Sequence, residues 1–101
     1  MFIGICLIEL HLPGVTSLKE KRGILKAILA RLHREFNVSA AEVALHDVWQ
    51  SASIGIATVS TSAAHANNLL ENALSWLEHN RPDLDMVAHS IEIVPFGTVA
   101  E

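Results

Sequence analysis

Two segments of this sequence place apolar residues at helical spacing, and each lies between runs of strand-forming residues. In the first segment these residues are Leu18, Leu25, Ile28, Leu29, Leu32 and Phe36, and in the second they are Ala66, Leu69, Leu70, Ala73, Trp76 and Leu77. A helix with one apolar stripe has to cover another apolar surface. The strand segments on either side of the two helices therefore decide the fold.

Residue types that begin and end helices bound both segments. Ser17 stands three residues before Glu20, which is the spacing of a capping box, and Asn37 is a suitable stop for the first helix. For the second helix, either Ser60 or Ser62 can serve as the N-terminal cap.

Four further segments are typical of β-strands: 2–10, 38–46, 51–60 and 86–94. The second and third are close enough to form a hairpin. The resulting order, β-α-β-β-α-β, predicts an α+β ferredoxin-like sandwich with a four-stranded antiparallel sheet and two helices on one face. The first and third strands should be central. We expect residues 1–96 to form a single domain and residues 97–101 a loose C-terminal tail.

The first strand segment is apolar on both of its faces. One face carries Ile3, Ile5 and Leu7, and the other carries Phe2, Cys6, Ile8 and Leu10. Helices can cover only one face, and a half-solvated sheet should alternate apolar and polar residues. We interpret the second face as a contact surface, most simply for a homodimer. The interface candidates are Phe2, Ile8, Leu10 and Trp49. The alternative is that Trp49, the loop "HLPGVT" or the C-terminal tail folds across this face.

Positive charge is concentrated in the first helix. The formal net charge is −4, which by itself argues against nucleic acid as a partner. Residues 17–36, however, hold six basic residues against Glu20 and Glu35, a net charge of +4. The rest of the chain holds Arg81 against nine acids, a net charge of −8. The sequence therefore predicts one basic element on an acidic body.

The basic helix is the candidate surface for RNA or another polyanion. On a helical wheel, Lys19, Arg22, Lys26 and His33 lie within about 60° of each other and flank the apolar stripe. Lys21 points toward that stripe, where its stem can pack while its amine reaches water. The candidate RNA- or anion-binding residues are Lys19, Lys21, Arg22, Lys26, Arg31 and Arg34. An ordinary solvated helix face is the other interpretation of the same residues.

Base stacking on the sheet, as in RNA-recognition motifs, is excluded by the lack of aromatic residues. The segment 51–60 has none, and the first strand has only Phe2 at its start. If RNA is bound, the basic helix should therefore contact it, mainly through the phosphates.

Metal and catalytic sites find no support in the residue spacing. The six histidines, which form no local two-ligand motif, are His11, His33, His46, His65, His79 and His89. Cys6 lies in mid-strand, where a buried thiol is inert. No nucleophile with an oriented base and no glycine-rich phosphate loop can be identified. We expect no metal, no cofactor, no small-molecule ligand and no enzymatic activity.

The cysteine count and the N-terminal run bear on location. A single cysteine cannot form an internal disulfide, which suits a reducing cytoplasm. The apolar run "MFIGICLIEL" is interrupted by Glu9 and is too short to span a bilayer. We expect a cytoplasmic protein without a membrane segment.

Several short motifs resemble those of one known family. "HLP" followed by "SLKEKR", and then "FNVS", "AEV" and "DVWQ" in this order, resemble the YlxP-like family, domain of unknown function number 503. The resemblance covers roughly residues 1–95, although the family pattern usually has a more polar residue where Leu45 and His46 stand. It implies a ferredoxin-like sandwich without established catalytic residues. Family genes tend to lie beside those for a translation initiation factor and a ribosome-binding factor, which implies a role in ribosome maturation or translation.

Two hypotheses for function follow. The first is a small non-catalytic protein that binds ribosomal RNA or ribosomal particles through its basic helix. The second is a protein-interaction module that homodimerises, or binds a partner, through the apolar face of its sheet. A small-molecule sensor is a third class, for which the residues specify no pocket.

Overall fold

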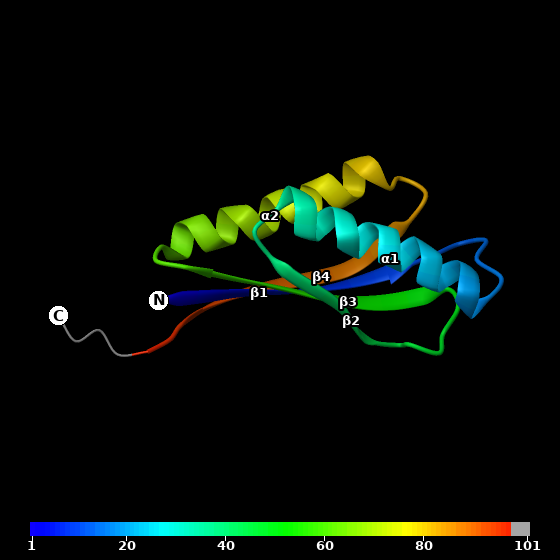
Figure 1. The fold of residues 1–101 in the computed structure, drawn as a ribbon, viewed down its shortest axis with the longest axis horizontal. Coiled ribbons are helices and arrows are strands. Elements are labelled where there is room, and N and C mark those ends of the chain that lie inside the picture. Colours follow the sequence, from blue (N-terminus) through cyan, green and yellow to red (C-terminus); the bar gives the residue numbers. More distant parts are fainter. Residues whose placement is uncertain (98–101) are drawn as a thin grey trace.

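The elements of the protein follow the predicted order β-α-β-β-α-β in a computed structural model that describes residues 1–97 (Figure 1). They are β1 (Phe2–His11), α1 (Leu18–Glu35), β2 (Ser39–Ala44), β3 (Ser51–Ser60), α2 (Ala63–Asn80) and β4 (Asp85–Pro95). The strands pair antiparallel in the order β2-β3-β1-β4, so β1 and β3 are central as expected. Both helices lie on one face of the sheet. This is the ferredoxin-like α+β sandwich. Of the predicted loose tail, residues 98–101 lie outside the described residues.

Serine side chains cap both helices. Ser17 Oγ accepts a hydrogen bond of 3.1 Å from the backbone N–H of Glu20, as the spacing predicts. The choice left open for α2 falls on Ser62, whose Oγ accepts from the backbone N–H of His65 at 3.2 Å. Neither helix, over the part of the chain that the structure describes, is long and apolar enough to cross a membrane.

The strand β2 is shorter than the predicted segment 38–46. It ends at Ala44 because Leu45 has a φ of 64°, in the left-handed region that cannot continue a strand. The backbone N–H of Val48 then donates to the carbonyl of Leu45 at 3.0 Å, which closes a turn. The connection from β2 to β3 therefore starts two residues earlier than expected.

The core lies between the helices and the face of β1 that carries Cys6, Ile8 and Leu10. All three are at most 2% exposed, whereas Ile5 and Leu7 on the other face are 45% and 42% exposed. The helices cover one apolar face of β1 and leave the other exposed, as predicted, but the face from which the interface candidates were taken was the wrong one. Ile8 and Leu10, predicted as interface residues, are core residues, because this is the face that the helices cover.

The other face of the sheet is open to solvent, and we call it the open face. Its exposed large apolar residues are Ile5, Leu7, Val43 and Val59. The predicted alternative, that Trp49 or the "HLPGVT" loop covers the second face, is also wrong, and the C-terminal tail named with them lies outside the described residues from residue 98 on. Leu12 and Val15 of the "HLPGVT" loop are buried in the core, and Trp49 is 51% exposed.

Candidate nucleic-acid interface

Three basic residues line one side of α1, and we call them the basic row: Lys19, Arg22 and Lys26. All three are exposed, and none forms an ion pair with any residue between 1 and 97. Their spacing of three and four residues places them on the same side of the helix. The row is therefore a set of free cations held by a regular element.

The basic row faces the edge of the sheet that β2 forms. His33, which shares its side of the helix, accepts a hydrogen bond of 3.0 Å at Nε2 from the backbone N–H of Ala40 in β2. Since β2 is an edge strand, this bond satisfies a backbone donor that would otherwise face outward. The row therefore runs beside an edge of the molecule.

Lys21 differs from its predicted role. Its side chain is buried, and its ammonium group donates to the carbonyl of Leu45 at 2.6 Å and to that of Val48 at 2.7 Å. The same nitrogen lies 2.9 Å from Glu42 Oε2, a buried oxygen atom with no hydrogen-bond partner besides this ion pair. Because the buried ammonium group is engaged by two carbonyl acceptors and an ion pair, Lys21 is not available to a phosphate. It instead joins α1 to the connection between β2 and β3.

The two remaining candidates on α1 differ from each other. The guanidinium group of Arg31 lies 5.3 Å from the ring centroid of Trp76 and 3.7 Å from Glu35, so it is engaged within the molecule. Arg34 is exposed and makes no ion pair within residues 1–97. It lies about 80° around the helix from Lys26, as an outer cation beside the row.

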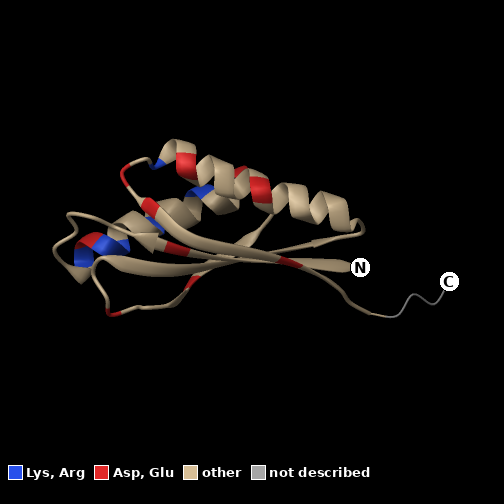
Figure 2. Cartoon of the chain, turned by 180° about the vertical axis from the view of Figure 1, so that it is seen from behind, with Lys and Arg blue, Asp and Glu red and all other residues tan. Residues whose placement is uncertain are grey.

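The charge distribution of the folded chain keeps the contrast predicted from the sequence. Figure 2 shows Lys and Arg gathered on α1, and Asp and Glu spread over α2, the strands and the loops. Arg81, the one Lys or Arg outside α1, donates to both carboxylate oxygens of Asp83 at 3.0 and 2.8 Å. This hydrogen-bonded pair lowers the pKa of Asp83 and raises that of Arg81. Among the described residues, the Lys and Arg side chains without an ion pair are therefore all on α1.

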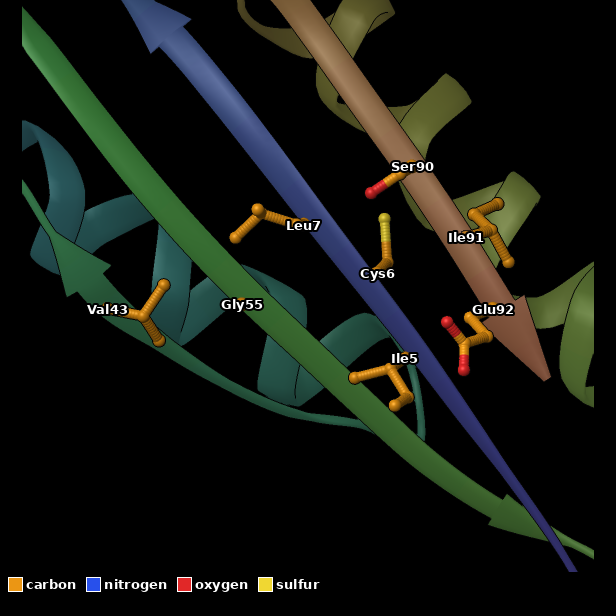
Figure 3. A pocket seen from close by; sticks show the side chains of 8 residues that line it. All are labelled: Ile5, Cys6, Leu7, Val43, Gly55, Ser90, Ile91 and Glu92. Atoms are coloured by element: carbon orange, nitrogen blue, oxygen red, sulfur yellow. The ribbon is translucent and has the colours of Figure 1, made fainter. Parts of the chain in front are cut away.

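The open face contains a shallow hollow of about 370 Å³, seen in Figure 3 with the helices behind the sheet. Its lining residues include Ile5, Leu7, Val43, Gly55, Ser90 and Glu92. Gly55 leaves room for Val43 here, because a Cβ atom at this position would lie 3.0 Å from Val43 Cγ1, a tight contact. Of the predicted interface residues, only Trp49 is exposed, and Phe2 is half-buried with the helix-facing side of β1.

Sequence reasoning missed the apolar residues of the open face, although one signal could have found them. Glu9 has the same strand parity as Ile5 and Leu7, and it is exposed beside them. A carboxylate on one face of a central strand indicates that this face meets water.

Outside α1, the titratable groups within residues 1–97 form no recognisable reaction centre. Burial raises the pKa of the Cys6 thiol to about 11, so at neutral pH it remains protonated and unreactive. Among the described residues, no three His, Cys, Asp or Glu side chains come together in a way that could hold a metal ion.

Comparisons with known proteins give one family and a common fold. The family model described as "Protein of unknown function (DUF503)" matches residues 3–91. The uncharacterized protein YlxP of Bacillus subtilis (strain 168) is 41% identical over 76 residues, which cover 75% of this chain and 83% of that protein.

Two solved structures resemble the fold at low sequence identity. The de novo designed protein Foldit4 is 13% identical with a TM-score of 0.52, over 96% of this chain and 100% of that one. The protein At3g17210 from Arabidopsis thaliana is 11% identical with a TM-score of 0.51, over 98% of this chain and 99% of that one. At these identities the likeness shows the fold alone.

Proposed function

Because this chain belongs to the DUF503 family, whose function is unknown, we propose its function from the surface of the molecule. The protein is a non-catalytic, cytoplasmic RNA-binding factor that contacts ribosomal RNA or ribosomal particles through α1. The observation that carries this proposal is the basic row, Lys19, Arg22 and Lys26, exposed and free of ion pairs among the described residues.

The physical basis is phosphate binding with release of counterions. Three cations spaced over about 10 Å of helix can neutralise neighbouring phosphates, and each neutralised phosphate adds a favourable, salt-sensitive increment of binding. The acidic remainder of the molecule repels the same polyanion. Binding is therefore restricted to α1. We choose ribosomal particles for the test because the gene neighbourhood of the family implies a role in ribosome maturation or translation.

The test compares two variants of equal net charge. Lys19→Gln/Arg22→Gln/Lys26→Gln removes three positive charges from the basic row. Ala64→Glu/Asn68→Glu/Asn72→Glu adds three negative charges at exposed positions of α2. We expect the first variant to lose co-sedimentation with ribosomal particles at low salt, and the second to keep most of it. Equal behaviour of the two would show that only net charge matters, and would overturn the assignment to α1.

A second candidate function, homodimerisation, is favoured by the open face. Ile5, Leu7 and Val59 present apolar surface to water, and a hollow lies beside them over Gly55. The strands β1, β2, β3 and β4 have 10, 6, 10 and 11 residues, so the sheet offers roughly 600 Å² of face and two copies would bury about 1,200 Å². This area reaches the lower limit of the area that stable interfaces bury. The open face of a second copy carries the same exposed apolar residues, so the two faces can pack against each other.

Light scattering at micromolar concentration tests the dimer. The expected result is a mass of two chains for the wild type and of one chain for Leu7→Glu, because a buried carboxylate would break the apolar contact. Val48→Glu places the same charge on an equally exposed apolar residue away from the strands, and it should leave the dimer intact. A monomeric wild type would contradict the proposal, whether or not another protein binds the same face.

A further inference from the structure

The connection between β2 and β3 exposes a tryptophan although its backbone is held firmly. Trp49 is 51% exposed, whereas Trp76 packs against Phe36 with ring centroids 6.2 Å apart and lies under Arg31. On the two sides of Trp49, the carbonyl of Val48 accepts from the Lys21 ammonium at 2.7 Å, and that of Gln50 accepts from the N–H of Leu12 at 2.9 Å. The exposure of Trp49 therefore does not come from an unanchored loop.

Further contacts tie the connection to its surroundings. The side chain of Gln50 donates to the carbonyl of Val15 at 3.2 Å, and the N–H of Val48 donates to the carbonyl of Leu45 at 3.0 Å. Because this backbone is anchored, a ligand that meets the exposed ring does not have to order the connection first.

The hydrogen bond from Lys21 to Val48 ties the connection that carries Trp49 to the first turns of α1, where the basic row begins. Lys21, which holds the carbonyl of Val48, directly precedes Arg22 in the helix, and Trp49 directly follows Val48. Figure 1 shows the β2–β3 connection and the first turn of α1 at the same end of the molecule. The basic row therefore leads along α1 to the end where the ring of Trp49 is exposed.

We infer that Trp49 and the basic row form one site for single-stranded RNA, in which an unpaired base stacks on the indole ring. This inference rests on the proposed function and names its substrate class. A base in a duplex is stacked between its neighbours and cannot reach a side chain on the protein surface. An exposed aromatic beside a line of cations is the arrangement by which proteins bind the bases and phosphates of a single strand.

The alternative occupant of this end is a protein, because Leu45 and Val48 are also partly exposed. The adjoining charge favours RNA, since Lys19, Arg22 and Lys26 form no ion pair among the described residues and Asp47 is the one acid in the connection. The open face, which includes β1 and β3, has no aromatic residue on its exposed positions, so Trp49 is the stacking surface that adjoins the cations.

Tryptophan fluorescence tests the inference directly. In the Trp76→Phe variant, Trp49 is the sole fluorophore, and titration with a short oligouridylate should quench its emission. Duplex RNA of equal charge should quench it much less. Trp49→Ala should weaken oligouridylate binding by about tenfold or more, whereas Trp49→Phe, which keeps a ring, should lose less. Both substitutions fall at an exposed side chain, and thermal unfolding verifies that the variants are folded.

The outcomes separate this inference from the proposed function. Suppose that the Gln variant of the basic row loses binding, Trp49→Ala binds like the wild type, and oligouridylate does not quench Trp49 in the Trp76→Phe variant. The phosphate site then stands and the stacking site is overturned. If neither variant changes binding, both are overturned. If Trp49→Ala changes the mass in light scattering but not RNA affinity, the ring contacts protein and the inference is wrong.

Discussion

Lys21 is the one charged residue among the described residues that is fully buried, and removing its ammonium group from water costs free energy. The cost is offset by two carbonyls and the carboxylate of Glu42, all within 2.9 Å. A buried ion pair contributes little net stability, but removing one partner leaves the other charge uncompensated. The residue therefore acts as a structural link between α1 and the connection that exposes Trp49.

Replacing Lys21 tests this role. Lys21→Met should lower the free energy of unfolding by about 3 kcal/mol, because Glu42 is left without its partner. Lys26→Met, an equivalent substitution at an exposed cation, should change it by less than about 0.5 kcal/mol. Chemical denaturation measures both. Equal effects would contradict the burial of the Lys21 ammonium group.

Leu45 is the second residue at which a local cost is visible. Its φ of 64° is unfavourable for a branched L-residue by about 1 kcal/mol or more, and asparagine tolerates this region better. We expect Leu45→Asn to raise the free energy of unfolding by about 0.5 kcal/mol, since the exposed side chain loses little burial. Val48→Asn, which has no positive φ to relieve, should not stabilise the protein. A melting temperature lowered equally by both substitutions would contradict this account.

At the scale of the elements, the pattern of the sequence predicts order, type and topology well, but not which face of a strand is covered. The helical stripes and the caps at Ser17 and Ser62 are local properties, so they can be read from the sequence. Strand β1 is apolar on both faces, and parity alone cannot assign Ile8 to the core and Leu7 to the open face. The signal in the sequence was Glu9, whose carboxylate indicates that its face of the strand meets water.

The candidate site could be predicted only in part for a similar reason. Lys19, Arg22 and Lys26 lie where helical periodicity places them, flanking the apolar stripe. The partner of Lys21, however, comes from β2, and a contact between residues 21 and 42 leaves no mark in the local pattern. Tertiary contacts likewise decide that Arg31 lies over Trp76.

At the scale of the whole molecule, the fold separates two surfaces by the thickness of one sheet and its helices. The basic row lies on α1, and the open face is the opposite side of the sheet (Figures 1 and 2). Two copies joined through their open faces would therefore keep both basic rows exposed on their outer sides.

In such a dimer one long RNA could contact both basic rows. Because Leu7→Glu should break the dimer, it should weaken the binding of long RNA more than the binding of short RNA. Equal losses for both lengths would contradict a two-row arrangement.

The salt dependence of RNA affinity tests the central claim most directly. Affinity for one single-stranded RNA is measured over a range of salt concentrations for the wild type, the Gln variant of the basic row and the Glu variant of α2. The wild type should give a log–log slope of about −2, from three phosphate contacts at about 0.7 each. The Glu variant should keep that slope, and the Gln variant should approach zero. A Gln variant with the wild-type slope would contradict the claim that Lys19, Arg22 and Lys26 contact the phosphates.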